Sequence, residues 1–568
     1  MKIRYVYLLA AIVCLLYNTA QATTYDAFND FSLTNNPNGT WSYGYGNAGT
    51  SFTLYPTSAT NCANIVGLSC WDVNPNSVPF VGKNVTSSPI TSGSLTIPTG
   101  LLAIHPFQTG PQADTIVEWT APSTGKYRLS GFYRLLDTQS VGVTALIYAG
   151  STQIFSQTLT TSNPSANFSI TQFLTAGETV QFAAGPNSAG GFFFDTTGFD
   201  ATIQPVLADP SEPGSIIVYQ QFQRGFVTVD AGLAGQSVQP RSLIELGATC
   251  PTDDTTCGVD IKVVRVNFHW VCPPQPDNAG AQFAATGGGV CVENDFFVNL
   301  TVNGKVWFSP EGGTTSGDLP GQIVPQAPCG RGYLIGFVTN IGKLEGDHTA
   351  VFEDSDRPIR FDGLIGDAVM RNTPQDLQAF RAITIQADPN TDEEDPLVGD
   401  GTGGPDSTGV GALVLNGRPG NYDSVTGQLS GDVRYDSDIN PPFADTALIF
   451  LTLDVASNQK NTPTYVNLNF YNAQQQAFSE ALSFTCWGQI NITTIDASLT
   501  QEGIGSARGL FITSQAYNPN STNPGQQVTL LGAVQITEGG TPGPANATRS
   551  YTVPVFDNSV PIRTTYFY

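Results

Sequence analysis

The chain has 568 residues, too many for one hydrophobic core, so at least two domains are expected. Its 47 acidic residues outnumber the 23 basic ones and give a net charge of −24, a surface that repels nucleic acid and anionic lipid. Charged residues make up only 12% of the chain and glycines number 59, a balance typical of extracellular β proteins rather than helical enzymes.

Residues 1–22 have the pattern of a secretory signal peptide. Lys2 and Arg4 precede an apolar run at 5–17, and Ala-Gln-Ala at 20–22 supplies a small-residue cleavage site. The apolar run is too short to span a bilayer comfortably, and no later segment is apolar and long enough to do so. We therefore expect a secreted or cell-surface protein with no membrane insertion after cleavage, and a mature chain of 546 residues.

Residues 23–204 are predicted to form an N-terminal β-sandwich. Apolar and polar residues alternate there with period two, β-branched and aromatic types dominate, and Gly, Pro, Asn or Ser ends each run. This pattern is typical of half-buried antiparallel strands joined by short turns. The clearest runs are 117–122, 126–133, 143–148, 168–170 and 178–183.

The same region contains the motifs Trp119-Thr-Ala-Pro, Gly125-Lys-Tyr, Leu174-Thr-Ala-Gly-Glu-Thr-Val-Gln-Phe and Asp195-Thr-Thr-Gly-Phe-Asp-Ala-Thr-Ile. With these motifs, residues 24–204 resemble the non-catalytic jelly-roll modules of bacterial secreted and surface proteins. Those modules are similar to carbohydrate-binding domains attached to extracellular enzymes. The resemblance implies a jelly-roll fold, a bacterial exported protein and an extracellular glycan as ligand.

Aromatic side chains in this domain are candidates for sugar binding, because ring faces stack on a pyranose while polar groups bond its hydroxyls. Trp41, Tyr43 and Tyr45 share one face of a predicted strand and would form a platform if that face is open. A core position is the alternative for each ring, and Trp119 is expected in the core. The candidate ligand-binding residues are Trp41, Tyr43, Tyr45, Trp71, Tyr133 and Asp195.

Residues 205–215, with three prolines and two acids, are the best linker in the sequence. Residues 216–515 are expected to form a larger β-sandwich region, either one sandwich or two fused ones. One short helix is predicted at 372–380, where Thr373 can cap it and Pro374 suits its first turn. Residues 516–568 are expected to be a C-terminal strand and tail, with a strand-like alternation at 527–536.

Three runs in the second region resemble those of uncharacterised exported bacterial proteins. That group has no assigned activity, so the resemblance adds no chemistry. The runs are Phe361-Asp-Gly-Leu-Ile-Gly-Asp-Ala-Val, Ala382-Ile-Thr-Ile-Gln-Ala and Tyr465-Val-Asn-Leu-Asn-Phe-Tyr-Asn.

Eight cysteines remain after signal cleavage, and an even number in an exported chain predicts disulfides. A zinc site is the alternative, but no CxxC pair occurs and the three histidines lie far apart in sequence. Sequence proximity suggests the pairs Cys62–Cys70, Cys250–Cys257 and Cys272–Cys291, which leaves Cys329–Cys486 as a long-range staple.

Residues 388–401 place six carboxylates in one loop. Oxygen ligands at alternating positions suit calcium, so Asp388, Asn390, Asp392 and Asp395 are candidate ligands of a structural calcium ion. A solvated acidic loop is the alternative, and it is favoured because Glu393 stands where an EF-hand loop needs Gly. No other cofactor is expected.

The sequence contains no catalytic motif that we recognise. It has no Gly-x-Ser-x-Gly elbow and no His-Glu-x-x-His helix, and His105, His269 and His348 have no sequence-local partners. We therefore expect no catalytic residues and a non-catalytic protein that binds an extracellular glycan or surface ligand. A structural or adhesive subunit that self-assembles by donating residues 527–536 to a neighbour is the alternative. A hydrolase with a hidden carboxylate pair is the third hypothesis.

Overall fold

The computed structural model shows an all-β chain, as the sequence predicts. It describes residues 24–74, 78–107, 114–187, 191–209, 211–230, 236–251, 262–274, 290–345, 349–352, 358–371, 377–387, 412–415, 417, 421–435, 443–453, 463–518, 526–539, 546–552 and 564–567. The chain divides into two compact units between Val206 and Leu207, within the expected linker. The expected signal peptide lies outside the described residues. Among the described residues, no helix is long and apolar enough to cross a membrane.

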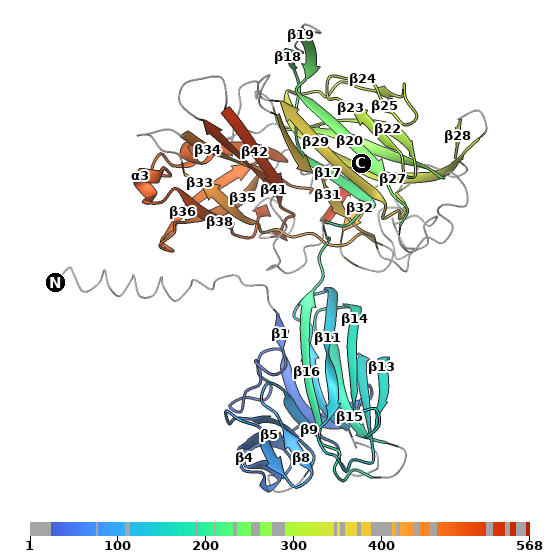
Figure 1. The fold of residues 1–568 in the computed structure, drawn as a ribbon, viewed down its shortest axis with the longest axis vertical. Helices are drawn as coiled ribbons and strands as arrows, with labels where there is room; N and C mark the ends of the chain where they lie inside the picture. Colours follow the sequence, from blue (N-terminus) through green and yellow to red (C-terminus); the bar gives the residue numbers. More distant parts are fainter. Residues whose placement is uncertain are drawn as a thin grey trace, which may run out of the picture. The chain divides into compact units, whose positions relative to one another are not determined.

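The N-terminal unit is a sandwich of two antiparallel sheets, called here sheet A and sheet B (Figure 1). Sheet A runs β14 (Ser165–Leu174), β11 (Gly125–Leu135), β16 (Thr197–Pro205), β9 (Leu102–His105), β6 (Phe80–Asn84), β5 (Leu68–Asp72) and β4 (Thr57–Thr60), with β1 (Tyr25–Asp26) on β16. Sheet B runs β13 (Thr152–Leu159), β12 (Val143–Ala149), β15 (Thr179–Pro186), β10 (Asp114–Thr120), β2 (Trp41–Asn47) and β3 (Ser51–Leu54). The chain crosses between the sheets at β1–β2, β3–β4, β9–β10, β10–β11, β11–β12, β13–β14, β14–β15 and β15–β16, which is jelly-roll connectivity.

Strand alternation builds the core of this unit. Residues at every second position of β10 and β11, such as Val117, Trp119 and Leu129, point between the sheets and are fully buried. Trp119 is therefore in the core, as predicted. The short η1 (Cys62–Asn64) and the ribbon β7 (Ile90–Ser92) with β8 (Leu95–Ile97) enclose a smaller apolar cluster at one end.

The first sandwich of the C-terminal unit consists of sheets C and D, whose facing sides form one core. Sheet C runs β25 (Ser316–Gly317), β23 (Lys305–Phe308), β20 (Ser242–Ala248), β29 (Leu364–Arg371) and β30 (Leu377–Arg381). Sheet D runs β22 (Val292–Thr301), β21 (Lys262–Cys272), β27 (Arg331–Leu344), β17 (Ile216–Gln223) and β31 (Ile383–Ile385), with β28 (Ala350–Val351) on β27.

The second sandwich of this unit consists of sheets E and F around another core. Sheet E runs β37 (Trp487–Asn491), β34 (Phe443–Leu451), β41 (Leu531–Gly539) and β42 (Asn546–Thr552). Sheet F runs β33 (Ser430–Arg434), β38 (Arg508–Thr513), β35 (Thr464–Tyr471), β39 (Tyr517–Asn518) and β40 (Gln526–Gln527), with β36 (Ala477–Phe484) on β35. Smaller elements are β18 (Phe226–Asp230) with β19 (Gln236–Pro240), β24 (Gly313–Thr314) with β26 (Ile323–Val324), β32 (Ala412–Leu415) with β43 (Thr564–Phe567), and the helices α2 (Ile492–Ile495) and α3 (Gln501–Ile504).

Sheets D and E pack against each other and fuse the two sandwiches. Val218 of β17 lies in this third core, whereas its neighbour Tyr219 points into the core between sheets C and D. Figure 1 shows the orange and red strands of the second sandwich beside the green and yellow strands of the first. The expected region 216–515 is thus built as two sandwiches that share an interface.

A chain of side-chain amides crosses this interface. Gln221 Nε2 donates to Gln489 Oε1 over 3.0 Å, and Gln489 Nε2 donates in turn to Gln535 Oε1 over 2.7 Å. Arg331 Nη1 also donates to Gln489 Oε1, at 3.2 Å. Because buried polar groups are costly unless they are hydrogen-bonded, these contacts favour one register between sheets D and E.

The disulfides differ in part from those expected. Cys62–Cys70 forms as predicted, but Cys272 pairs with Cys329 and Cys291 pairs with Cys486. The expected pairs Cys272–Cys291 and Cys329–Cys486 are therefore wrong.

The physical reason is the side of sheet D that each sulfur faces. Cys272 and Cys329 lie in the core between sheets C and D, whereas Cys291 and Cys486 lie in the core between sheets D and E. Proximity in sequence does not bring two side chains together when a sheet separates them. Cys250 is also disulfide-bonded, and its expected partner Cys257 lies outside the described residues.

One further expectation in the C-terminal unit needs correction. Leu377–Arg381 is β30, paired with β29, so the described part of the predicted helix 372–380 is a strand. Gln378 and Phe380 are buried while their neighbours are exposed, and this period-two burial overrides the local helix-start signals. The strand expected at 527–536 is present as β41, which lies between β34 and β42 within sheet E.

We predict that the Cys291–Cys486 bond contributes more stability than the Cys272–Cys329 bond. The residues are separated by 195 and 57 positions, and in the chain-entropy model closing these loops contributes about 5 and about 4 kcal/mol respectively. The paired alanine variants Cys291→Ala/Cys486→Ala and Cys272→Ala/Cys329→Ala should lower the free energy of unfolding in that order in urea titrations. An equal or reversed order would contradict the assignment of Cys291–Cys486 as the staple between the two sandwiches.

Candidate functional site

The expected aromatic platform is closed. Trp41 and Tyr43 are only 1% and 0% exposed, because their face of β2 is turned toward the core between sheets A and B. Tyr45 is half-buried and its ring stacks on Tyr55, with 5.5 Å between ring centroids. Trp41 and Tyr43 therefore have no open face for a sugar, and the expected platform of three rings is not present.

Two other predicted ligand residues also belong to the interior. Trp71 Nε1 donates a 2.7 Å hydrogen bond to the carbonyl of Ser32, and Tyr133 Oη donates a 2.9 Å bond to the carbonyl of Leu146. Both side chains are buried, and Tyr133 packs against Phe199 in the main core. The polar atom of each side chain is thus hydrogen-bonded to a backbone carbonyl, as is usual for buried Trp and Tyr.

Asp195 is the last predicted ligand residue, and it joins two loops at one end of the sandwich. Ser140 Oγ donates to Asp195 Oδ1 over 2.7 Å, and the Gly142 amide donates to Ser140 Oγ. The carboxylate is fully buried, and its Oδ2 has no hydrogen-bond partner among the described residues. Burial raises the pKa of Asp195 to about 6, opposed by the hydrogen bond from Ser140 and assisted by the charge of Asp137.

A concave site lies beside this cluster, where β11 ends. We call it the β8–β11 pocket; its volume is about 400 Å³. The chain that follows β11 forms its floor, with the Thr96 amide bonded to the Leu136 carbonyl on one side and the Leu135 amide bonded to the Pro164 carbonyl on the other. The pocket is lined by Thr96, Pro98, Arg134, Leu135, Leu136, Asp137, Thr138, Thr161 and Pro164.

The pocket combines groups that bind polar ligands. Asp137 is 6% exposed, and its Oδ1 accepts a 2.9 Å hydrogen bond from the Gln139 amide. Arg134 is exposed at the pocket, and three threonines add hydroxyl groups. A carboxylate that accepts, a guanidinium that donates and hydroxyls that do both suit a ligand rich in hydroxyl groups.

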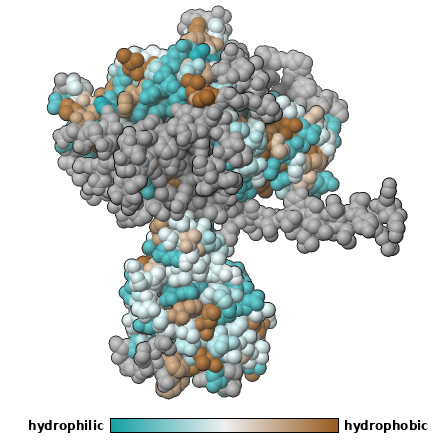
Figure 2. Space-filling model, turned by 180° about the vertical axis from the view of Figure 1, so that it is seen from behind, coloured by the Kyte–Doolittle hydropathy of each residue, from teal (hydrophilic) through white to brown (hydrophobic). Residues whose placement is uncertain are grey.

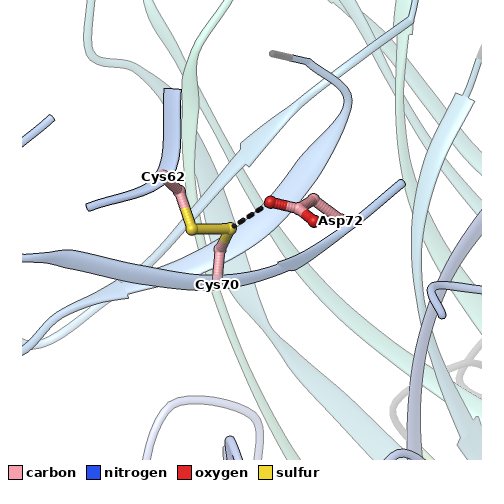
Figure 3. A group of neighbouring side chains, drawn as sticks. All are labelled: Cys62, Cys70 and Asp72. Carbon is pink, nitrogen blue, oxygen red and sulfur yellow. Dashed lines mark hydrogen bonds between the residues drawn. A yellow bond between two sulfur atoms is a disulfide. The ribbon is translucent and has the colours of Figure 1, made fainter. Parts of the chain in front are cut away.

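One cluster in the N-terminal unit has the residue types of a metal site, namely Cys62, Cys70 and Asp72 (Figure 3). Both sulfurs are joined in a disulfide and offer no thiolate. Asp72 is buried, which raises its pKa, and its Oδ2 lies 3.2 Å from Cys70 Sγ. Because a disulfide sulfur carries no hydrogen and no charge, this contact gives no arrangement that would hold a metal ion, and the cluster is structural.

The buried histidines have structural surroundings. His105 Nδ1 lies 2.8 Å from the carbonyl of Pro106, and burial lowers its pKa to about 4, so the ring stays neutral. His269 lies on β21 inside sheet D, with its Nδ1 3.8 Å from Glu293 Oε2 and its ring stacked on Phe337. Neither histidine lines the β8–β11 pocket.

Apolar side chains are exposed at the loop ends of the N-terminal unit. Phe193 is 66% exposed. Val141 is also exposed, and its carbonyl accepts a hydrogen bond from the side chain of Asn187. Figure 2 shows one face of the molecule, on which hydrophobic residues gather in small patches between hydrophilic ones. Such exposed residues are common on protein surfaces and identify no ligand by themselves.

The candidate calcium ligands Asp388, Asn390, Asp392 and Asp395 lie outside the described residues. Structural calcium therefore stays a prediction from the sequence.

No family model matches the chain, and no curated protein matches it. Among solved structures, a chain from an archaeal virus with a triple jelly-roll fold and turret assembly is 7% identical, with a TM-score of 0.14 over 76% of this chain and 87% of that one. A chain of Sulfolobus turreted icosahedral virus is 9% identical, with a TM-score of 0.13 over 80% of this chain and 89% of that one. Scores this low support no inference about function.

We predict that replacing Asp195 with Asn makes the N-terminal unit less sensitive to pH. Because the native pKa of about 6 exceeds the unfolded value of about 3.9, the native state binds this proton more tightly. The resulting stability is fully present below pH about 4 and is lost as the pH rises through about 6. The free energy of unfolding of Asp195→Asn, relative to that of wild type, should therefore rise by about 2 kcal/mol between pH 4 and pH 7. Hydrogen exchange of the β11 and β16 amides measures both free energies. A difference between variant and wild type that stays constant with pH would contradict this prediction.

Proposed function

We propose that the protein is an exported, non-catalytic binding protein that holds an extracellular glycan in the β8–β11 pocket. The observation that carries the proposal is the pocket itself, a cavity of about 400 Å³ with one carboxylate, one guanidinium and three hydroxyl side chains on its wall. Ligand sites of this kind are typically concave and present a few polar groups among apolar ones.

The lining matches the surface of a sugar. Sugar hydroxyls can donate to Asp137 and accept from Arg134, and the threonine hydroxyls can do either. Leu136, Pro98 and Pro164 supply apolar contact for the C–H groups of a ring. The resemblance of residues 24–204 to jelly-roll modules of bacterial secreted proteins motivates the same assignment, as do the expected signal peptide and the disulfides.

The arrangement of carboxylates supports a binding role rather than hydrolysis. A glycosidase needs two carboxyl groups that both flank the scissile bond. Asp137 lines the pocket, but Asp195, whose pKa the charge of Asp137 helps to raise, is fully buried and bonded to Ser140. Asp195 does not line the pocket, so this pair does not have the placement that a hydrolase requires.

A structural or adhesive role is the second candidate. Donation of residues 527–536 to a neighbouring molecule is not supported, because most of this segment is β41, an inner strand of sheet E that is paired on both sides. The observation that favours self-assembly is β13, an edge strand of sheet B whose residues are mostly exposed. Edge strands can accept a strand from a neighbouring molecule.

We predict that Asp137→Asn weakens glycan binding at least about tenfold, because the neutral amide replaces a charged acceptor worth about 1.5 kcal/mol or more. The mature protein would first be screened on a glycan array, and the ligand then titrated by calorimetry.

Glu178→Gln is the matched control, since Glu178 is a carboxylate of the same unit outside the pocket. Equal binding by wild type and Asp137→Asn, or an array without any ligand, would reject the proposal.

A further inference from the structure

We infer that the β8–β11 pocket selects acidic sugars, with Arg134 holding the carboxylate of the ligand and Asp137 holding its hydroxyls. This inference rests on the proposed function and narrows it to a substrate class, the uronic acids and related sugar acids. Four features of the N-terminal unit support it.

The first feature is the lack of a stacking surface. The described residues that line the pocket include no Trp, Tyr or Phe. The aromatic rings that the sequence suggested for sugar binding are in the interior of the sandwich or stacked on another ring. Neutral sugars are commonly held by ring stacking, so affinity here has to come from charged and polar contacts.

The second feature is the state of Arg134. Its side chain is exposed at the pocket, and no ion pair or hydrogen bond joins it to any residue that the structure describes. The nearby carboxylate of Asp137 is buried and receives the Gln139 amide. The planar guanidinium therefore keeps its donors for a ligand, and its fork matches a carboxylate in a bidentate pair.

The third feature is the placement of Asp137. As a second charged group in the same pocket, it repels a ligand carboxylate and attracts hydroxyl donors. An acidic sugar therefore has one favoured orientation, with its carboxylate at Arg134 and its hydroxyls at Asp137. A neutral sugar has no such preference, and it leaves the guanidinium without a charged partner.

The fourth feature is the distribution of charge along the chain. Residues 24–206 contain nine acidic and four basic residues, a net charge of −5, whereas the mature chain carries −26. Three of the four basic residues, Lys126, Arg128 and Arg134, lie on β11. Because charges are screened within about 8 Å at physiological salt, the local groups decide whether an anion binds.

The test uses D-galacturonate and its methyl ester as probes, titrated into the mature protein by calorimetry or NMR. The ester keeps the ring and every hydroxyl and removes only the negative charge. Galacturonate should bind about tenfold more tightly than the ester, and the preference should weaken as salt rises. In Arg134→Gln the ratio of the two affinities should fall to about one or below, because Asp137 then acts on the ligand carboxylate unopposed.

Arg128→Gln is the matched control, because Arg128 is exposed on the same strand and face but does not line the pocket. This variant should keep the tenfold preference. Equal affinity for acid and ester, or a preference that survives Arg134→Gln, overturns the selection of acidic sugars while glycan binding stands. If neither probe binds and the array returns no ligand, both the inference and the proposed function fail.

Discussion

The architecture of the C-terminal unit depends on sheet D, which is buried on both of its faces. Alternate residues of β17 and β27 point into the core with sheet C and into the core with sheet E. Burying one large aliphatic side chain contributes about 1.5–3 kcal/mol, so each of these strands stabilises two interfaces at once. The glutamine network around Gln489 and the Cys291–Cys486 bond then fix how the second sandwich sits on that sheet.

Much of the fold could be predicted from the sequence, because strands leave a local signal. Period-two alternation identified β10, β11 and β12, and it placed Trp119 in the core. The errors came where contacts distant in sequence decide the outcome. The pairing of Leu377–Arg381 with β29 overrode helix-start residues, and the two faces of sheet D decided which cysteines meet.

The candidate site was less predictable for the same reason. The pocket is formed by β8, the end of β11 and the 161–164 turn, which no sequence spacing connects. Trp41 and Tyr43 looked like a platform because period two gives a shared face but does not say whether that face is open. Asp195 was singled out by its motif and lies close enough to Asp137 for their charges to interact, yet it ties loops together rather than lining the cavity.

The central position of β41 also constrains biosynthesis. Sheet E lacks its middle strand until the ribosome has made residue 539, so the apolar face of sheet D has no complete cover for most of translation. Cys291 likewise emerges long before Cys486. During that interval Cys291 has no native partner, so a wrong bond to Cys272 or Cys329 can form first and has to be exchanged before the native pairs close.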